Sequence, residues 1–206
     1  MKIFSTSYFP SIALSAAMVR YGGEQSKIEI HETFPKQTHR NRTVIETANG
    51  AMTLSVPVTR KNGNHTATRD IAVSYAERWN FVHWRAIESA YNASPYFLYY
   101  RDEVESLLMR RYDYLIDLNE ATMRLMYEKM KCEYLLEWTE DFEKDIPPEE
   151  DYKDRYSYKK RDGLPYMEPY SQVFHGKEEF DGNVSFLDLL FNLGPESVDY
   201  LSKIRC

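Results

Sequence analysis

Hydrophobic and polar positions alternate along several short stretches in the first third of the chain. The stretch Lys2–Phe9 predicts a strand, and Ile12–Tyr21 predicts a helix that ends at Gly22-Gly23. In Lys27–Glu32, isoleucines alternate with polar residues, which predicts a second strand. A strand, a short helix and a strand in this order are typical of a right-handed parallel βαβ unit.

A β-hairpin is expected next. Arg42–Ala48 and Ala51–Val58 carry apolar side chains at alternate positions, and Asn49-Gly50 separates them. Asn-Gly is the preferred two-residue turn because both central residues need a positive φ. Ile71–Val73 predicts one more short strand.

Beyond these strands the period of the pattern changes to that of a helix. Trp79, Val82, Ala86 and Ala90 recur at helical spacing, and this helix is expected to stop at Ser94-Pro95.

Four further helices are expected, at about 102–112, 118–130, 185–191 and 196–204. Asp117 or Asn119 is a candidate cap for the helix at 118–130, and Ser185 with Asp188 has the arrangement of a capping box. The pattern therefore predicts an α/β (or α+β) fold, with an N-terminal βαβ unit plus β-hairpin as the sheet core and a helical C-terminal half.

The composition limits the class of protein. With 206 residues, 43% of them hydrophobic and 15% aromatic, the chain is not disordered throughout and is expected to form a single domain over 1–206. A net charge of −6 argues against a dedicated nucleic-acid-binding protein, and two cysteines exclude a disulfide framework. No stretch reaches the ~18 apolar residues of a membrane-spanning helix. Pro10 interrupts the N-terminal apolar run, so a cytoplasmic location is expected rather than secretion.

One segment is dominated by charge. Acidic side chains are concentrated in 137–151 and basic ones in 153–161, around Pro147-Pro148. Opposite charge blocks around a double proline predict a solvated, flexible loop over 139–163. The alternative is a lid or tether in which the two charge blocks pair.

The segment from His31 to Arg42 is the strongest candidate for chemistry, since standard phosphate-loop, dinucleotide, zinc-protease and serine-hydrolase motifs are absent from the sequence. It lies after a predicted strand, where ligands bind in open α/β sheets. Its cations are suited to holding a phosphate or carboxylate, and its amides to orienting polar groups: Lys36, Arg40 and Arg42, with Gln37 and Asn41. The alternative is a solvated turn whose arginines pair with acidic side chains.

Three histidines are candidates for acid–base or metal chemistry. His31, assisted by Glu32, and His83 are candidate general bases. His31 and His39 without a third ligand are a weak metal signal, so no metal site is expected. Ser5 and Ser7 lie near the end of the first strand, where a nucleophile would be placed, but the sequence supplies them with no positioned base.

Aromatic residues surround His83. Trp79, Trp84 and Arg85 would suit a stacking platform for a sugar or a base, and the alternative is a packed helix with His83 hydrogen-bonded at its edge.

Taken together, several blocks resemble the WbqC-like protein family, in the family's order and over nearly the whole chain. These are Tyr8-Phe9-Pro10; His31-Glu32; Lys36-Gln37-Thr38; Arg40-Asn41-Arg42; Asn49-Gly50 with Val56-Pro57-Val58; Trp79 with His83-Trp84-Arg85-Ala86-Ile87; Ser89-Ala90-Tyr91; Ser94-Pro95-Tyr96-Phe97; Leu118-Asn119; Tyr170 with Gln172-Val173-Phe174; and Ser185 with Asp188-Leu189-Leu190-Phe191-Asn192 and Gly194-Pro195. The chain departs from the family at Thr6-Ser7, where many members have Gln-Pro, at His39, where the family's usual residue is Tyr, and at Ala13-Leu14-Ser15.

The resemblance implies a single-domain bacterial protein, associated in some members with O-antigen and surface-polysaccharide gene clusters. It implies no particular reaction and no particular cofactor. It places interest on residues that match family positions, namely Tyr8, His31, Lys36, Gln37, Arg40, Asn41, Arg42 and His83.

The function expected from these observations is group transfer (acyl, aminoacyl or glycosyl-related) in bacterial surface-polysaccharide biosynthesis. Its substrate would be a small activated donor or a sugar, without nucleic-acid partners or membrane insertion. Two alternatives from other classes remain open. One is a non-catalytic protein that binds a nucleotide sugar or carbohydrate, and the other is a partner in a glycan-biosynthesis complex, contacted through the charged segment.

Overall fold

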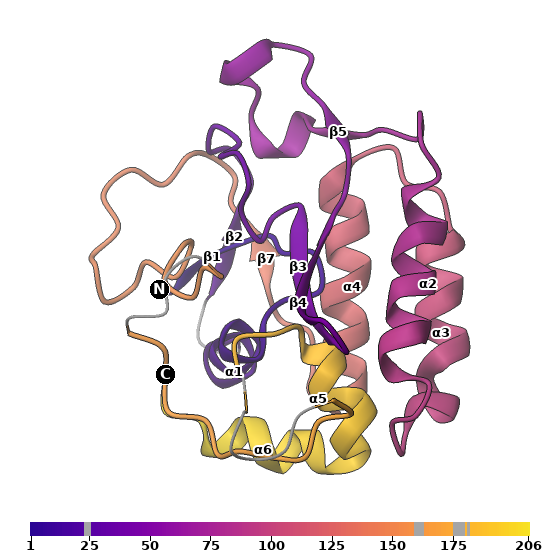
Figure 1. Cartoon of the computed structure of the whole chain (residues 1–206). Coiled ribbons are helices and arrows are strands. Elements are labelled where there is room, and N and C mark those ends of the chain that lie inside the picture. The colour runs from indigo at the N-terminus through magenta and orange to yellow at the C-terminus, as the bar shows by residue number, and fades with distance from the viewer. Residues whose placement is uncertain (23–25, 159–162, 175–179, 181) are drawn as a thin grey trace.

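A small parallel sheet lies at the centre of the α/β fold, in a computed structural model that describes residues 1–22, 26–158, 163–174, 180 and 182–206 (Figure 1). Strand β1 (Ile3–Ser5) pairs in parallel with β2 (Lys27–Glu29), and helix α1 (Ile12–Tyr21) connects them. This confirms the predicted strand, helix and parallel strand. Both strands are shorter than predicted, because the chain leaves the sheet after Ser5 and after Glu29.

Helix α1 has the predicted bounds. The Ser11 side chain caps its start by accepting a hydrogen bond from the Leu14 amide, and Ile12–Met18 are all buried. A helix that is apolar on every side must be covered on every side. In Figure 1 it lies between the sheet and the C-terminal helices α5 (Phe186–Leu193) and α6 (Ser197–Lys203).

The charged segment completes the sheet, which the sequence pattern did not predict. Strand β7 (Glu137–Trp138) pairs in parallel with β2, and Asp151 bridges Ile3 on the other side of β1. Tyr152 is 3% exposed, so the described part of this segment is not solvated throughout. Residues 159–162 of the predicted loop lie outside the described residues.

The hairpin is formed by β3 (Arg42–Thr47) and β4 (Gly50–Ser55). The predicted turn is off by one residue: Thr47 pairs with Gly50, so Ala48-Asn49 forms the connection. Only Gly50 has a positive φ there, at 91°.

The chain after the hairpin enters a separate two-stranded sheet. Val58 belongs to β5 (Val58–Thr59), which pairs with β6 (Ala72–Val73), close to the predicted short strand at 71–73. Pro57 has no backbone N–H with which to continue a ladder. Two short 3₁₀ helices, Gly63–His65 and Thr68–Asp70, connect β5 to β6.

Three longer helices pack beside the sheets: α2 (Trp79–Tyr91), α3 (Phe97–Met109) and α4 (Leu115–Lys129). The predicted buried face of α2 is wrong at Val82, which is 64% exposed, while His83 and Ile87 are buried. Helix α3 begins five positions before the predicted start.

The predicted caps are partly confirmed. Neither Asp117 nor Asn119 caps α4, whose start has no side-chain cap. Ser185 does cap α5, by accepting from the Leu187 amide. Asp188 is not part of a capping box, since its buried carboxylate accepts hydrogen bonds from Tyr170 and Gln172.

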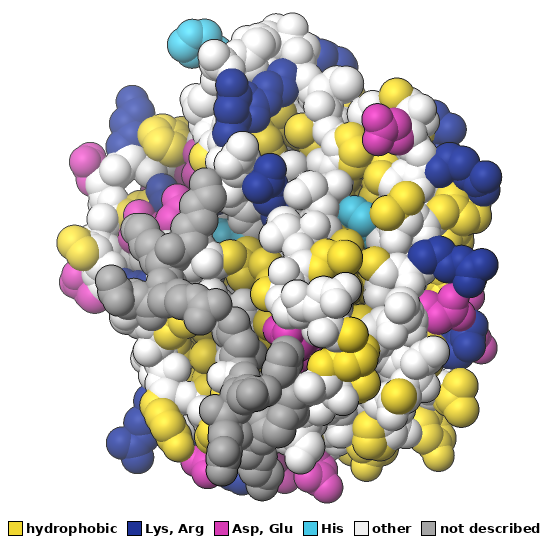
Figure 2. Space-filling model, viewed as in Figure 1, with side chains coloured by type: hydrophobic (Ala, Val, Ile, Leu, Met, Phe, Trp, Pro, Cys, Tyr) yellow, Lys and Arg dark blue, Asp and Glu magenta, His cyan; other side chains and the backbone are white. Residues whose placement is uncertain are grey.

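The surface shows no single dominant patch in the view of Figure 2, where basic side chains are interspersed with apolar and polar ones. Within the described part of the chain, no helix has both the length and the apolar character needed to cross a membrane.

Candidate functional site

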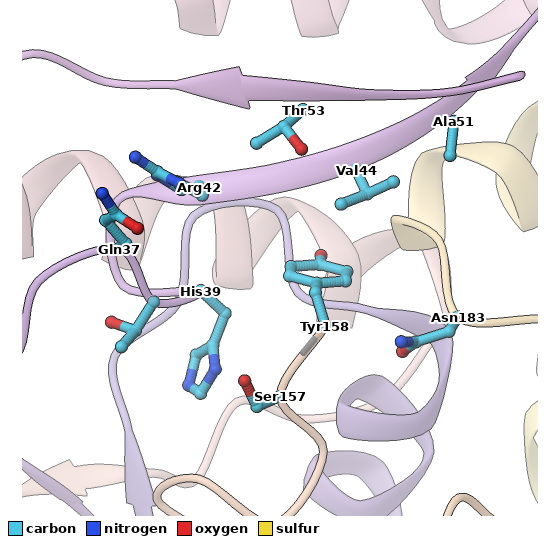
Figure 3. A pocket seen from close by; sticks show the side chains of 10 residues that line it. Gln37, His39, Arg42, Val44, Ala51, Thr53, Ser157, Tyr158 and Asn183 are labelled. Atoms are coloured by element: carbon cyan, nitrogen blue, oxygen red, sulfur yellow. The ribbon is translucent and has the colours of Figure 1, made fainter. Parts of the chain in front are cut away.

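A pocket of about 260 Å³ lies between the 37–42 segment, the β3–β4 hairpin and residues 157–158 and 183 (Figure 3). In Figure 3, Gln37 and Arg42 lie at one end and Asn183 at the other, with Tyr158 between them. Gln37 and the hairpin residue Thr53 are exposed, so the pocket opens to the surface.

The alternation of β3 places its side chains on two faces. Arg42 and Val44 line the pocket, while Thr43 and Ile45 are buried on the opposite side. Residues from β4 complete this wall, because the antiparallel register puts Thr53 opposite Val44. Of the predicted binding residues at 36–42, Arg42 thus reaches the pocket by strand geometry, and Gln37 reaches it from the preceding turn.

Gln37 has a left-handed backbone, with φ at 60°. This conformation costs a residue with a Cβ roughly 1–2 kcal/mol. Asn41 N–H donates to the Thr38 carbonyl at 3.2 Å and Tyr8 N–H donates to the His39 carbonyl at 3.0 Å, which holds the turn in place. The strain therefore falls on a residue whose side chain lines the pocket.

Buried polar atoms without partners gather at this pocket. Thr38 Oγ1, His39 Nδ1 and Arg42 Nε are buried and have no hydrogen-bond partner among the described residues. A buried polar atom without a partner costs about 1–3 kcal/mol. Three such atoms lining one cavity favour a site that takes a polar ligand.

His39 is the buried histidine of the pocket, at 2% exposure. Its Nε2 lies 2.5 Å from Ser5 Oγ, and Ser5 Oγ donates to the Lys153 carbonyl at 2.9 Å. Burial lowers the pKa of His39 to about 3, with a further lowering by Arg40 and an opposing effect of Asp154. The imidazole is therefore neutral near pH 7.

The sequence pattern offered His39 only as a weak metal ligand and Ser5 only as a nucleophile without a base, and it did not predict that the two residues meet. The contact that joins them spans 34 positions, which no local spacing reveals. Ser5 does have a histidine beside it, although the sequence alone supplied none.

Arg40 does not take the predicted donor-binding role. Its guanidinium is buried, with Nε donating to Glu32 Oε1 at 2.5 Å and Nη1 donating to Asp154 Oδ1 at 2.9 Å. Burial raises the pKa of Glu32, and the Arg40 charge opposes this rise. Glu32 therefore pairs with Arg40 and does not orient His31, which corrects the predicted pair.

The remaining residues of the predicted block, His31, Lys36 and Asn41, do not line the pocket. His31 Nε2 contacts the Thr139 carbonyl at 2.9 Å, and its Nδ1 contacts Arg69 Nη1 at 3.0 Å. Lys36 is exposed and does not line the pocket. Asn41 Nδ2 donates to the Val56 carbonyl at 3.0 Å, which anchors the start of the hairpin.

Tyr8 and His83 form a buried pair in the core. Tyr8 Oη lies 2.9 Å from His83 Nδ1, and burial lowers the pKa of His83 to about 4. Trp79 packs on His83 with ring centroids 5.1 Å apart. His83 is thus a core histidine and not a general base of the pocket.

The predicted stacking platform is wrong. Trp84 is 5% exposed and stacks on Phe97, and Trp79 is 4% exposed. The Arg85 side chain is 80% exposed and pairs with Glu88 at 2.9 Å. The alternative interpretation, a packed helix, is confirmed. The described residues contain no group of three His, Cys, Asp or Glu side chains placed to hold a metal ion.

Comparisons with known proteins support the predicted resemblance. The model of the WbqC-like protein family matches residues 8–151, which include the 37–42 segment and the hairpin. The uncharacterized protein Rv1507c of Mycobacterium tuberculosis (strain ATCC 25618 / H37Rv) is 27% identical over 229 residues, covering 96% of this chain and 93% of that protein. No solved structure matches the chain.

Proposed function

Because the chain belongs to the WbqC-like protein family, we propose that its pocket is the active site of a group-transfer enzyme of bacterial surface-polysaccharide biosynthesis. The enzyme would move a small acyl, aminoacyl or sugar group from an activated donor to an amine or hydroxyl. One observation carries the proposal: Thr38, His39 and Arg42 line one cavity, and each has a buried polar atom without a partner among the described residues.

The volume of the pocket limits what enters it. A cavity of about 150 Å³ holds a benzene molecule. A pocket of about 260 Å³ therefore suits a sugar-sized or aminoacyl-sized group and is too small for a complete nucleotide sugar or acyl-coenzyme A. The transferred group would occupy the pocket while the rest of the donor lies outside it.

The donors and acceptors of the pocket suit such chemistry. Arg42 Nε–H has no partner among the described residues and would donate to an oxygen that carries or develops negative charge. The Gln37 amide lies at the same end of the pocket in Figure 3 and would fix the orientation of the group. A protein that binds sugars on exposed tryptophans is not supported, since Trp79 and Trp84 are buried.

The test is a thermal-unfolding screen of the pure protein against nucleotide sugars, acyl-coenzyme A and analogues of aminoacyl-adenylates. A ligand at about 100 times its Kd should add roughly 2.7 kcal/mol of stability. Transfer from each ligand found is then followed by mass spectrometry with amine and hydroxyl acceptors.

Two variants make the test specific. Arg42→Gln should abolish the stabilisation, whereas Arg124→Gln, an exposed arginine of α4 outside the pocket, should leave it unchanged. Binding that survives Arg42→Gln, or a ligand that binds without ever being transferred, would contradict the proposal.

A further inference from the structure

The two ring nitrogens of His39 have different surroundings. Nε2 contacts Ser5 Oγ at 2.5 Å, whereas Nδ1 is buried without a partner among the described residues. His39 lines the pocket, and Ser5 does not. Ser5 thus holds the ring through Nε2, and Nδ1 is left for a ligand in the pocket.

The hydrogen bonds of Ser5 determine which nitrogen of His39 carries the proton. The Lys153 carbonyl only accepts, and the single hydroxyl hydrogen of Ser5 is directed to it at 2.9 Å. Ser5 Oγ therefore accepts from His39 Nε2–H. With the proton on Nε2 of a neutral ring, Nδ1 presents a bare lone pair.

The charges packed around His39 come from three parts of the chain. Arg40 follows it directly and disfavours the protonated ring, while Asp154 favours it. Glu32 and Asp154 both pair with Arg40 and offset its charge. The ring is neutral at rest, and the Asp154 carboxylate only partly offsets the burial and the Arg40 charge that disfavour a proton on it.

On this basis we propose that His39 is the general base of the site, that its Nδ1 takes the proton of the acceptor in acyl transfer, and that Ser5 is its positioning residue. This inference rests on the proposed function.

The step balances without any further reactant. The acceptor nitrogen or oxygen attacks the carbonyl carbon of the acyl donor, and its proton passes to His39 Nδ1. The carbonyl electron pair moves onto the oxygen, where Arg42 Nε–H donates to it. When the intermediate collapses, the bond to the leaving group breaks, and that group departs with the proton from His39.

Ser5 is better suited to positioning the ring than to attacking the donor. It is fully buried, does not line the pocket, and gives its hydrogen to a backbone carbonyl. An attacking serine would have to be accessible to the donor and give its proton to the histidine.

The first experiment compares His39→Gln and His39→Asn with the wild-type protein, and with His65→Gln as a control at an exposed histidine. With the donor found in the screen, kcat should fall about a hundredfold or more in both His39 variants. Donor binding by calorimetry should stay within about twofold, since proton transfer and not binding is lost. Transfer that survives in either His39 variant would overturn the assignment.

The second experiment needs no turnover. Nitrogen-15 NMR of labelled histidine in the wild-type protein should show His39 protonated on Nε2 and bare on Nδ1. In Ser5→Ala the preference for this tautomer should weaken, and kcat should fall about tenfold or more with KM unchanged. A proton on Nδ1 in the wild-type protein would overturn the inference. An acyl adduct on Ser5, seen by intact mass during turnover, would do the same and make Ser5 the nucleophile.

The outcomes separate the two proposals. If the wild-type protein transfers no group from any donor, the proposed function fails and the base assignment fails with it. If the wild-type protein and the His39 variants transfer equally well, only the base assignment fails.

Discussion

Arg40 and Asp154 lie 114 positions apart in the chain and meet through Nη1 and Oδ1 at 2.9 Å, next to the histidine of the pocket. The same guanidinium contacts Glu32 at 2.5 Å, so the buried Arg40 side chain connects the segment that contains Glu32 to the segment that contains Asp154. The pocket is therefore held in part by an ion pair that makes no contact with it.

Removing this cation should be costly. Arg40→Ala leaves Glu32 largely buried without its partner, and breaking a buried pair costs about 3–5 kcal/mol. Asp154→Ala should cost about 1 kcal/mol or less, since the Asp154 side chain is 50% exposed. Urea unfolding measures both, and equal losses in the two variants would contradict the burial argument.

Stability should fall as the pH is lowered from about 6.5 toward 4. The pKa values of His39 and His83 are lowered to about 3 and about 4 in the folded protein, so the unfolded chain binds protons first as the pH falls. Burial raises the pKa values of Glu32 and Asp188, which act in the opposite direction at the lower end of this range.

The histidine contribution is isolated by a variant. Between pH 6.5 and 4, the wild-type protein should lose more unfolding free energy than His39→Gln does. The difference should be on the order of 2 kcal/mol. Denaturant titrations at several pH values give this difference. An identical pH dependence in the two proteins would show that His39 is not held neutral by the fold.

Tyr8→Phe should destabilise the core without changing the pocket. It removes the partner of the buried His83 Nδ1 at 2.9 Å, which costs about 1–3 kcal/mol. Tyr99→Phe is the matched control, since Tyr99 is 76% exposed. Urea unfolding should show the loss in the first variant only, and ligand binding should persist in both.

Gln37 should show opposite effects on stability and binding. Gln37→Gly relieves the left-handed strain and should raise the unfolding free energy by roughly 0.5–1 kcal/mol relative to Gln37→Ala, which keeps a Cβ there. Both variants lose the amide and should bind the donor equally weakly. Calorimetry measures donor binding, and urea unfolding measures stability. If Gln37→Gly is less stable than Gln37→Ala, the backbone at position 37 is not strained.

Amines should be better acceptors than alcohols of similar size. A histidine whose pKa lies near 3 is a weak base, and general-base efficiency follows the strength of the base. Attack by a neutral amine makes its N–H acidic once the bond forms, whereas a hydroxyl must lose its proton during attack. Comparing kcat/KM for paired acceptors checks this, and a preference for the hydroxyl would contradict it.

The elements predicted correctly from the sequence are those fixed by local signals. Helix α1 begins after the Ser11 cap and ends at Gly22, so residues next to the helix signal both of its ends. Helix α3 begins at Phe97, two residues after Pro95, without a side-chain cap that would mark its start. Strand β7 has two residues, too few to show any period.

The site was predicted only in part because its contacts are not local. Alternation along β3 placed Arg42 on the pocket wall, and the adjoining turn placed Gln37 there. The tertiary fold alone determined that Arg40 would face inward to Asp154 and that His39 would meet Ser5. Residues of one short polar block thus divide between the pocket, the core and the surface.

The sheet has a consequence for the order of folding during synthesis. Strands β1 and β2 emerge early, whereas their outer edges are covered, in the part of the chain that the structure describes, by β7 and by Asp151. Until residues 137–152 leave the ribosome, the early pair has two open edges, which are templates for pairing with other chains. Pairing so distant in sequence is slow to form. The first strand of the sheet to be made is therefore among the last to be enclosed, and the nascent chain depends on its own charged segment, or on a chaperone, for protection.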